Sequence, residues 1–405
     1  MAASPDYNLG AFASEALALA YVQSNRWDVA GTGWTNPLVG MFFVDTVAVS
    51  RKWWDGAAWQ VIGGGSGAFD YVVSTAAEFL TAYAAAAAGS VIYCKAGTYD
   101  FAAQIVLKTG VVVRGAGKGL TIFRFTGASG VFLYYSPAVL GPYTFNNNLA
   151  RVQYSLTTTT AAEAGNIADG DLLAIAGFAV GGPNRRHMAR ANGAGIAGSG
   201  VFNFFEPTLS LVRDNGGGTP ATVTVCAAAD VLVGGGIYDM TIRYAGIPTA
   251  PVYGISTRWT DGLILERVRF EDWTEGTHGS VGAELLYAYG PSINIEGAGC
   301  DRSLTANVIS DPKIKVTDYY SLGTSYVISA YACTGGFWEL TSHGAPSASY
   351  PIGVNQLQGA QIHATAYDGG PQGIKMEYGE ENVLRWRCEG GIVTTGDVGS
   401  SMVGT

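Results

Sequence analysis

The sequence predicts an all-β protein whose main body is a solenoid of short strands. First, short β-branched runs lie too close together for βαβ crossovers, which need about a dozen residues between parallel strands. Second, strand-like runs recur with a period in the low twenties over the C-terminal part, as in stacked coils. Third, 57 of the 405 residues are glycine and only 14% are charged, which suits a turn-rich β architecture and argues against disorder.

Residues 1–65 are predicted to form a separate, small β-rich module. Residues 41–44 and 47–52 have strand-like composition, and the Asp-Gly pair at 55–56 is typical of a tight hairpin turn. A short helix is expected over residues 14–23. Three tryptophans flank the turn and either fill a small core or form an interaction surface: Trp53, Trp54 and Trp59.

Residues 66–126 are predicted to hold a capping helix and the first coils of the solenoid. Thr75 is a candidate N-cap, and Glu78 follows it at the spacing of a capping box. Gly89 stands where a left-handed residue would end the helix. The expected apolar face of the helix consists of Phe79, Leu80 and Tyr83. Short strands are expected at 91–93, 105–107, 111–113 and 121–123.

Residues 127–236 are less regular and predict further coils with a β-rich excursion from the solenoid. Arg185 and Arg186 form a small basic cluster, for which a solvated loop is favoured over contact with an anionic partner. Strand-like runs lie at 131–135, 149–156, 171–176, 209–212 and 222–226.

Residues 237–405 predict the regular body of the solenoid and a short C-terminal tail. The strand-like runs lie at 240–244, 263–270, 292–296, 313–317, 337–340, 361–364 and 383–387. Their apolar anchors are Ile295, Val316, Leu340, Ile362 and Leu384, at successive spacings of 21, 24, 22 and 22 residues. An earlier pair, Ile242 and Val268, is 26 residues apart. Alternate residues of each strand should face the interior.

The composition also excludes several function classes. A net charge of −9 disfavours a nucleic-acid partner, because phosphate binding needs a basic surface. The sequence contains no run of about 18 apolar residues, so no membrane span is expected. The N-terminus lacks the basic region of a secretory signal. Five scattered cysteines without a CxxC pair predict buried free thiols, and four scattered histidines show no metal-ligand spacing. No cofactor and no metal are expected.

One segment carries a family resemblance. Ala96-Gly97-Thr98-Tyr99, followed by the run Arg114–Gly119, resembles the start of a pectate-lyase-like right-handed parallel β-helix, an opening common in bacteriophage tailspikes and related virion fibres. A phosphate-binding loop is not supported at Arg114–Gly119, because Gly119 follows Lys118 where such a loop needs Ser or Thr. Its glycines are expected to serve tight corners.

The resemblance implies a homotrimeric virion protein, either a tail spike, a fibre or a head-surface projection. It would assemble in the host cytoplasm, attach to other virion proteins through residues 1–65, and contact host cell-surface polysaccharide. The alternative is a polysaccharide depolymerase, either a hydrolase or a lyase, so whether the protein is an enzyme stays open. A bacterial cell-surface β-helix protein is a third interpretation. The short tail after residue 393 favours the structural role.

A cluster of acidic residues favours the enzyme. Glu266, Glu271, Asp272 and Glu275 are interleaved with Arg267 and Arg269, and Glu284, Glu296 and Asp301 are expected on neighbouring coils. Because carbohydrate chemistry uses paired carboxylates, residues 259–301 are a candidate glycan groove with Glu271 and Asp272 as its catalytic residues. The expected sugar-stacking residues are Trp259, Trp273, Tyr287 and Tyr289. The competing interpretation is a solvated face or a set of ion pairs between subunits.

Overall fold

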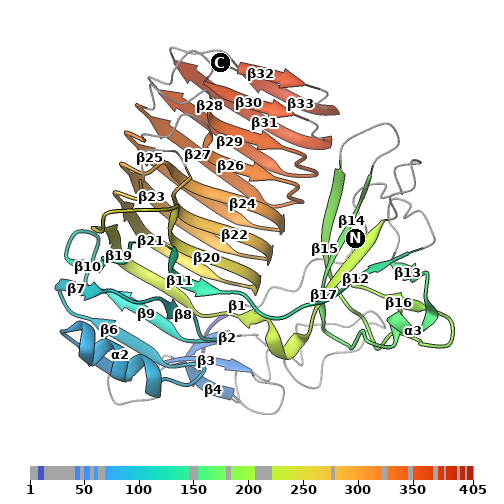
Figure 1. Ribbon diagram of the computed structural model, residues 1–405, viewed down its shortest axis with the longest axis horizontal. Coiled ribbons are helices and arrows are strands. Elements are labelled where there is room, and N and C mark those ends of the chain that lie inside the picture. Colours follow the sequence, from blue (N-terminus) through green and yellow to red (C-terminus); the bar gives the residue numbers. More distant parts are fainter. Residues whose placement is uncertain are drawn as a thin grey trace. The chain divides into compact units, whose positions relative to one another are not determined.

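The computed structural model (Figure 1) is all-β, with 6% of its residues helical, and its parallel strands stack into a β-solenoid of about 11 turns. It describes residues 8–12, 42–45, 50–54, 59–62, 69–128, 130–145, 154–178, 184–205, 221–274, 279–321, 326–344, 350–367, 373–377, 380–389, 393–396 and 399–404. Two compact units divide the chain: residues 1–95 with 110–114, and residues 96–109 with 115–405.

The first unit begins with a small sheet in the order β1-β2-β3-β4, made of Asn8–Phe12, Phe42–Asp45, Ser50–Trp54 and Trp59–Ile62. β3 and β4 pair antiparallel with Trp54 opposite Trp59, so they form the hairpin expected around residues 55–56. The tryptophan side chains and the helix expected over 14–23 lie outside the described residues.

Helix α2 (Ala76–Ala85) packs against β5 (Tyr71–Val73) and β6 (Val91–Cys94), and β9 (Val112–Gly115) pairs with β6. Thr75 caps the helix as predicted, because its Oγ1 accepts a hydrogen bond from the Glu78 backbone N–H at 3.2 Å.

Two details of the helix prediction are wrong. Leu80 is 48% exposed, and the buried face is instead Phe79, Ala82 and Tyr83. The helix ends at Ala85, with Ala86 as its C-cap, so Gly89 does not end it. Gly89 lies in the following turn at φ +90°, and its N–H donates to the Gly110 carbonyl at 2.9 Å.

Two long parallel sheets build the second unit (Figure 1, cyan through red). We call them sheet A and sheet B. In pairing order, sheet A here contains β7 (Gly97–Phe101), β10 (Thr121–Phe125), β19 (Gly236–Tyr244), β21 (Ile264–Glu271), β23 (Ser292–Ala298), β25 (Lys313–Tyr319), β27 (Phe337–His343), β29 (Gln361–Tyr367), β31 (Glu380–Glu389) and β33 (Gly399–Gly404).

Sheet B contains β8 (Ile105–Val106), β11 (Gly130–Tyr135), β20 (Val252–Asp261), β22 (Val281–Tyr289), β24 (Arg302–Ser310), β26 (Tyr326–Tyr331), β28 (Tyr350–Asn355), β30 (Ile374–Glu377) and β32 (Val393–Gly396), with β18 (Leu232–Val233) beside β20. Each coil of the regular body contributes one strand to each sheet, because consecutive strands alternate between A and B.

The strands predicted in the regular body all belong to sheet A, and the sequence analysis missed their partners in sheet B. The reason is the pattern of burial in sheet B. Four consecutive residues are buried in β20 (254–257) and in β28 (351–354). Such runs do not alternate between buried and exposed side chains, and that alternation is the signal that predicts a half-buried strand.

The predicted coil spacings are correct for three of five pairs. The structure pairs Ile295 with Val316, Val316 with Leu340, and Ile362 with Leu384. The other two spacings are wrong by two residues, because Leu340 pairs with Ala364 and Ile242 pairs with Phe270. A two-residue shift keeps the same side chains inward, so the alternation alone does not detect it.

The described strands between residues 140 and 226 form a separate antiparallel sheet, which we call the excursion. Its antiparallel sheet has the order β12 (Leu140–Thr144), β17 (Thr222–Cys226), β14 (Leu172–Phe178), β15 (Asn184–Arg190). Beside it lie β13 (Ser155–Thr157), which pairs with β16 (Val201–Asn203), the short helix α3 (Ala161–Ala164) and the 3-10 turn Ala228–Asp230. The loop predicted at Arg185 and Arg186 is wrong, because both residues lie in β15 and pair with β14.

One carboxylate in the solenoid interior is surrounded by serine hydroxyls. Asp318 is fully buried and accepts hydrogen bonds from the hydroxyls of Ser303, Ser321 and Ser342, the last at 3.4 Å. Gly297 on the preceding coil leaves room for them, since a Cβ there would lie 1.7 Å from the Ser303 Oγ. Burial outweighs these hydrogen bonds and raises the pKa of Asp318 to about 6.

The raised pKa of Asp318 predicts stability that falls with rising pH. Between its ordinary value of 3.8 and about 6 the folded chain binds this proton more tightly than the unfolded chain. The contribution to stability is therefore present below pH 4 and is lost as the pH rises through 6, by up to about 3 kcal/mol. In urea unfolding, Asp318→Asn should match the parent protein near pH 4 and exceed it near pH 7. A constant difference between the two proteins at both pH values would contradict this assignment.

The tight corner at Gly115 predicts a second effect. A Cβ on Gly115 would lie 2.4 Å from the Asp239 carbonyl oxygen and 2.8 Å from the Thr121 Cβ. Gly115→Ala should therefore lower the free energy of unfolding by about 2–3 kcal/mol. Gly198→Ala is the control, because a Cβ there meets no atom within 4 Å and the backbone is not left-handed. The control should be neutral or slightly stabilising; equal losses in both variants would contradict the clash.

Candidate functional site

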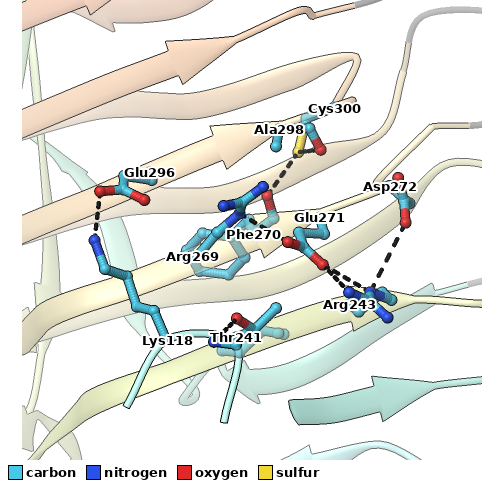
Figure 2. A network of polar contacts seen from close by, with 12 residues as sticks. Lys118, Thr241, Arg243, Arg269, Phe270, Glu271, Asp272, Glu296, Ala298 and Cys300 are labelled. Carbon is cyan, nitrogen blue, oxygen red and sulfur yellow. Dashed lines mark hydrogen bonds and ion pairs between the residues drawn. The ribbon is translucent and has the colours of Figure 1, made fainter. Parts of the chain in front are cut away.

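The outer face of sheet A presents side chains in columns that run from coil to coil. One column aligns Arg243, Glu271 and Ala298, and a neighbouring column aligns Thr241, Arg269 and Glu296. Strand neighbours in such a column lie about 4.8 Å apart, so side chains of opposite charge on adjacent coils meet. Figure 2 shows the resulting network, which we call the acidic surface: Lys118, Arg243, Arg269, Glu271, Asp272 and Glu296.

Glu271 is held by two guanidinium groups. Its Oε2 accepts hydrogen bonds from Arg243, with the Nε at 2.7 Å, and its Oε1 lies 2.7 Å from the Arg269 Nε. The Arg269 contact is an ion pair without hydrogen-bond alignment. Only 14% of the Glu271 side chain is exposed, so this carboxylate is largely committed to the two arginines.

Asp272 differs from its neighbour in exposure and in backbone. It leaves the end of β21 at φ +63°, and 64% of its side chain is exposed. Its Oδ2 lies 3.9 Å from the Arg243 Nε, so one guanidinium stands between the two candidate catalytic carboxylates. Partial burial, followed by the nearby charge of Glu271, raises the pKa of Asp272. The structure thus combines one clamped carboxylate with one accessible carboxyl group that protonates more readily than usual.

Lys118 brings a distant segment to this surface. Its Nζ forms an ion pair with Glu296, which lies two coils beyond Thr241 in the same column. The adjacent Gly119 N–H donates to the Thr241 Oγ1 at 3.0 Å (Figure 2). The segment that resembles the start of a β-helix therefore also supplies one cation of the candidate site.

A second polar group lies along the next column of sheet A. Arg267 binds Asp239 with two parallel hydrogen bonds, at 2.6 and 2.9 Å, and contacts Glu266 at 3.2 Å. Asn294 donates to the same Glu266 at 2.9 Å. The charged and polar groups on adjacent coils therefore pair with one another. This pairing agrees with the interpretation of a solvated charged face.

Two further predicted acidic residues, Glu284 and Asp301, do not join the acidic surface. Glu284 lies on sheet B, where it accepts a hydrogen bond from Ser256. Asp301 is fully buried and accepts from the Thr274 hydroxyl at 2.6 Å. Glu275 lies outside the described residues.

The structure does not bring the predicted sugar-stacking residues to the acidic surface. Trp273 is fully buried, with its ring stacked 6.2 Å from that of Phe125 and its Nε1 donating to the Ile242 carbonyl at 3.0 Å. A buried indole of this kind stabilises the core and offers no face to solvent.

Trp259, Tyr287 and Tyr289 lie on sheet B, against the excursion. Trp259 is 3% exposed and stacks on Tyr287 with the ring centroids 4.8 Å apart. The excursion covers them, and its Arg190 guanidinium lies 5.3 Å from the Tyr289 ring and binds Asp261 at 2.6 Å. We call the packed set the docking cluster: Leu172, Ala174, Met188, Cys226, Val231, Trp259, Val308 and Ala332, with Tyr287, Tyr289 and Tyr331 at its edge.

The sequence analysis missed an aromatic column on sheet A. Tyr319, His343 and Tyr367 occupy matching positions of three successive coils, and their rings stack with centroids 5.2 and 4.7 Å apart. The Arg387 guanidinium lies 5.7 Å from the Tyr367 ring. The spacing of 24 residues between these rings is the signal that could have found them. Because their faces cover each other, the rings expose mainly edges.

Other site types receive no support in the described ranges. No group of three or more His, Cys, Asp or Glu residues there could hold a metal ion. The cysteines are free thiols, four of them buried, and burial raises the pKa of Cys333 to about 12. No helix within those ranges is both long and apolar enough to cross a membrane.

Comparisons with known proteins give structural matches only. No protein-family model and no curated protein matches the chain. Among solved structures, the tailspike of Pseudomonas phage phi297 has 13% identity and a TM-score of 0.41, with 81% of this chain and 70% of that chain covered. The tailspike of Acinetobacter baumannii bacteriophage AP22, solved with a capsular saccharide, has 10% identity and a TM-score of 0.34, with 82% and 63% covered. The A-module of an Azotobacter vinelandii mannuronan C-5 epimerase has 11% identity and a TM-score of 0.28, with 81% and 94% covered.

The position of Trp259 predicts an effect on stability. Trp259→Ala should leave a cavity in the docking cluster and lower the free energy of unfolding by about 3–5 kcal/mol. The matched control is Tyr320→Ala, because Tyr320 is also left-handed, at φ +56°, but is 73% exposed. We expect the control to change stability by less than about 1 kcal/mol. Loss of glycan binding by Trp259→Ala without loss of stability would instead support the sugar-stacking role.

Proposed function

We propose that this chain is a structural protein of a bacteriophage virion, either a tail spike, a fibre or a head-surface projection, that contacts host surface glycans. The observation that carries the proposal is a parallel β-helix whose outer face holds polar side chains in fixed columns. The resemblance of residues 96–99 and 114–119 to the start of tailspike β-helices supports the same class.

The acidic surface supports contact with a polar polymer. Its side chains are held by ion pairs between coils, so a ligand that binds there meets groups that are already ordered. The cations of this surface are paired with Glu271 and Glu296: Arg243, Arg269 and Lys118. The surface therefore carries little net charge with which to attract a charged ligand. Asp272 projects at the edge of the acidic surface, where its carboxyl group can accept hydrogen bonds from sugar hydroxyls or, when protonated, donate one to them.

The alternative function is a polysaccharide depolymerase. One observation favours it: Asp272 is exposed and has a raised pKa, which are the properties of a general acid. Glu271 would be its carboxylate partner across the Arg243 guanidinium. The commitment of Glu271 to two arginines favours binding over cleavage, since a nucleophile or base needs an accessible lone pair.

Assembly and location are part of the proposal. A homotrimer would cover faces of the parallel coils that otherwise stay open. The β1–β4 module would attach the protein to other virion proteins, and assembly would take place in the host cytoplasm.

The test is to expose the purified protein to a panel of bacterial surface polysaccharides and to record retention, new reducing ends and the ultraviolet absorbance of unsaturated sugars together. Replacing both Glu271 and Asp272 by alanine should weaken glycan binding by about 10-fold or more. It should also abolish any cleavage that the parent protein shows.

The control for this test is a double alanine variant of Lys315 and Glu339, an exposed ion pair at 2.7 Å on the same face of sheet A. It should bind glycan as the parent protein does. Unchanged binding and cleavage by the Glu271 and Asp272 variant, with its fold verified by thermal unfolding, would remove the acidic surface from the proposal.

A further inference from the structure

A small hollow lies on the outer face of sheet B, away from the acidic surface. Its volume is about 80 Å³, and it opens between strands β26, β28 and β30. Pockets for drug-sized ligands hold roughly 300–1,000 Å³, so this hollow fits the edge or one substituent of a sugar ring and not an oligosaccharide. The residues that line it and carry the argument are Tyr326, Ser329, Gly353, Asn355, Lys375 and Glu377.

A glycine shapes the aromatic wall of the hollow. A Cβ on Gly353 would lie 2.1 Å from the Tyr326 Cδ1, so the ring lies over the glycine backbone in space that no larger residue would leave. Tyr326 also stacks on Tyr350, with the centroids 5.7 Å apart, and the Lys375 Nζ lies 5.1 Å from the Tyr350 ring. These contacts fix one apolar wall beside polar groups, which is the mixed character that sugar binding uses.

The polar groups form a connected set that still lacks one donor. Lys375 contacts Glu377 at 2.9 Å, and the Asn355 Nδ2 donates to the same carboxylate at 3.3 Å. The Asn355 Oδ1 is buried, and no hydrogen-bond donor in the described part of the chain reaches it. A buried amide oxygen without a donor is costly, so a ligand N–H or O–H at this point would complete the set.

The charges within the hollow balance. The side chains of Lys375 and Glu377 are only 22% and 27% exposed, and each neutralises the other. The hydrogen bond to Glu377 raises the pKa of Lys375 and so keeps the ammonium form. The Arg186 guanidinium of the excursion lies 5.9 Å from the Tyr331 ring at the edge of the hollow. A neutral ligand therefore fits better than an acidic one.

We infer that this hollow is a second carbohydrate subsite, which takes a hydroxyl or acetamido edge of one uncharged sugar residue. Asn355 would accept a hydrogen bond from the sugar, Lys375 and Ser329 would donate, and the Tyr326 ring would cover an apolar patch of the sugar. The inference rests on the proposed function for the class of ligand. Its position on sheet B makes it independent of Glu271 and Asp272.

The test uses two free sugars, methyl N-acetyl-β-glucosaminide and glucuronate, with binding followed by saturation-transfer NMR on the full chain. A single sugar bound at one small site should show a Kd on the order of 1–10 mM. Asn355→Ala should weaken binding of the uncharged sugar about 10-fold. The matched control is Asn294→Ala, because Asn294 also donates to a glutamate one coil away but does not line this hollow.

The outcomes are distinct. Loss of binding in Asn355→Ala, with retention in Asn294→Ala and in the double alanine variant of Lys315 and Glu339, supports the subsite. If Asn355→Ala does not fold, Tyr326→Ala replaces it and should also weaken binding, because it removes the ring that would cover the sugar. Retained binding in the Asn355 or Tyr326 variant overturns the inference, as does loss only in the Glu271 and Asp272 variant. Absence of binding by the uncharged sugar, or tighter binding of glucuronate, overturns it as well.

Discussion

The backbone hydrogen bonds between successive parallel coils are the constraint on which the rest of this structure depends. They fix which residue lies above which, and they do so over the whole regular body of sheets A and B. Each side chain therefore meets the side chain at the same position of the next coil. Stacked rings, paired charges and buried hydroxyl groups all follow from this one register.

The register divides the same strands into two chemistries. On sheet A the inward column contains Phe270, Gly297, Asp318 and Ser342, and the glycine makes room for the serine–aspartate group on the next coil. The outward columns carry the ion pairs of the acidic surface and the ring stack around His343. A change at one inward position must be accommodated by its neighbours above and below, whereas an outward position can vary with only its ion pair at stake.

The excursion changes the function available to sheet B. It covers Trp259 and Tyr287 with an apolar cluster and adds the Arg190–Asp261 ion pair at its edge. The part of sheet B around β26, β28 and β30 holds the hollow beside Tyr326. Two surfaces of different chemistry thus lie on different sheets: the acidic surface on sheet A, and the small hollow with its aromatic and amide side chains on sheet B.

The sequence alone determined the solenoid, the capped helix and the coil period. Thr75 and Glu78 mark the helix start by local hydrogen bonding, and strict alternation marks the strands of sheet A, so both signals lie within a few residues of chain. Part of the acidic surface was also predicted, because Glu271, Asp272 and Arg269 lie close together in the sequence. Its cations Lys118 and Arg243 come from more distant segments and were not predicted.

Only the tertiary structure decided which aromatic residues reach solvent, which coils pair, and where the hollow lies. Trp273 and Trp259 have the composition of sugar-binding residues but are buried by segments more than thirty residues away, Ile242 and Met188 among them. Several strands of sheet B carry no simple alternation, since they bury runs of consecutive residues. Asn355 and Lys375 lie twenty residues apart, and only the stacking of coils brings them together. Local patterns record the conformation of single strands, whereas surfaces on a solenoid are made by residues about one coil apart.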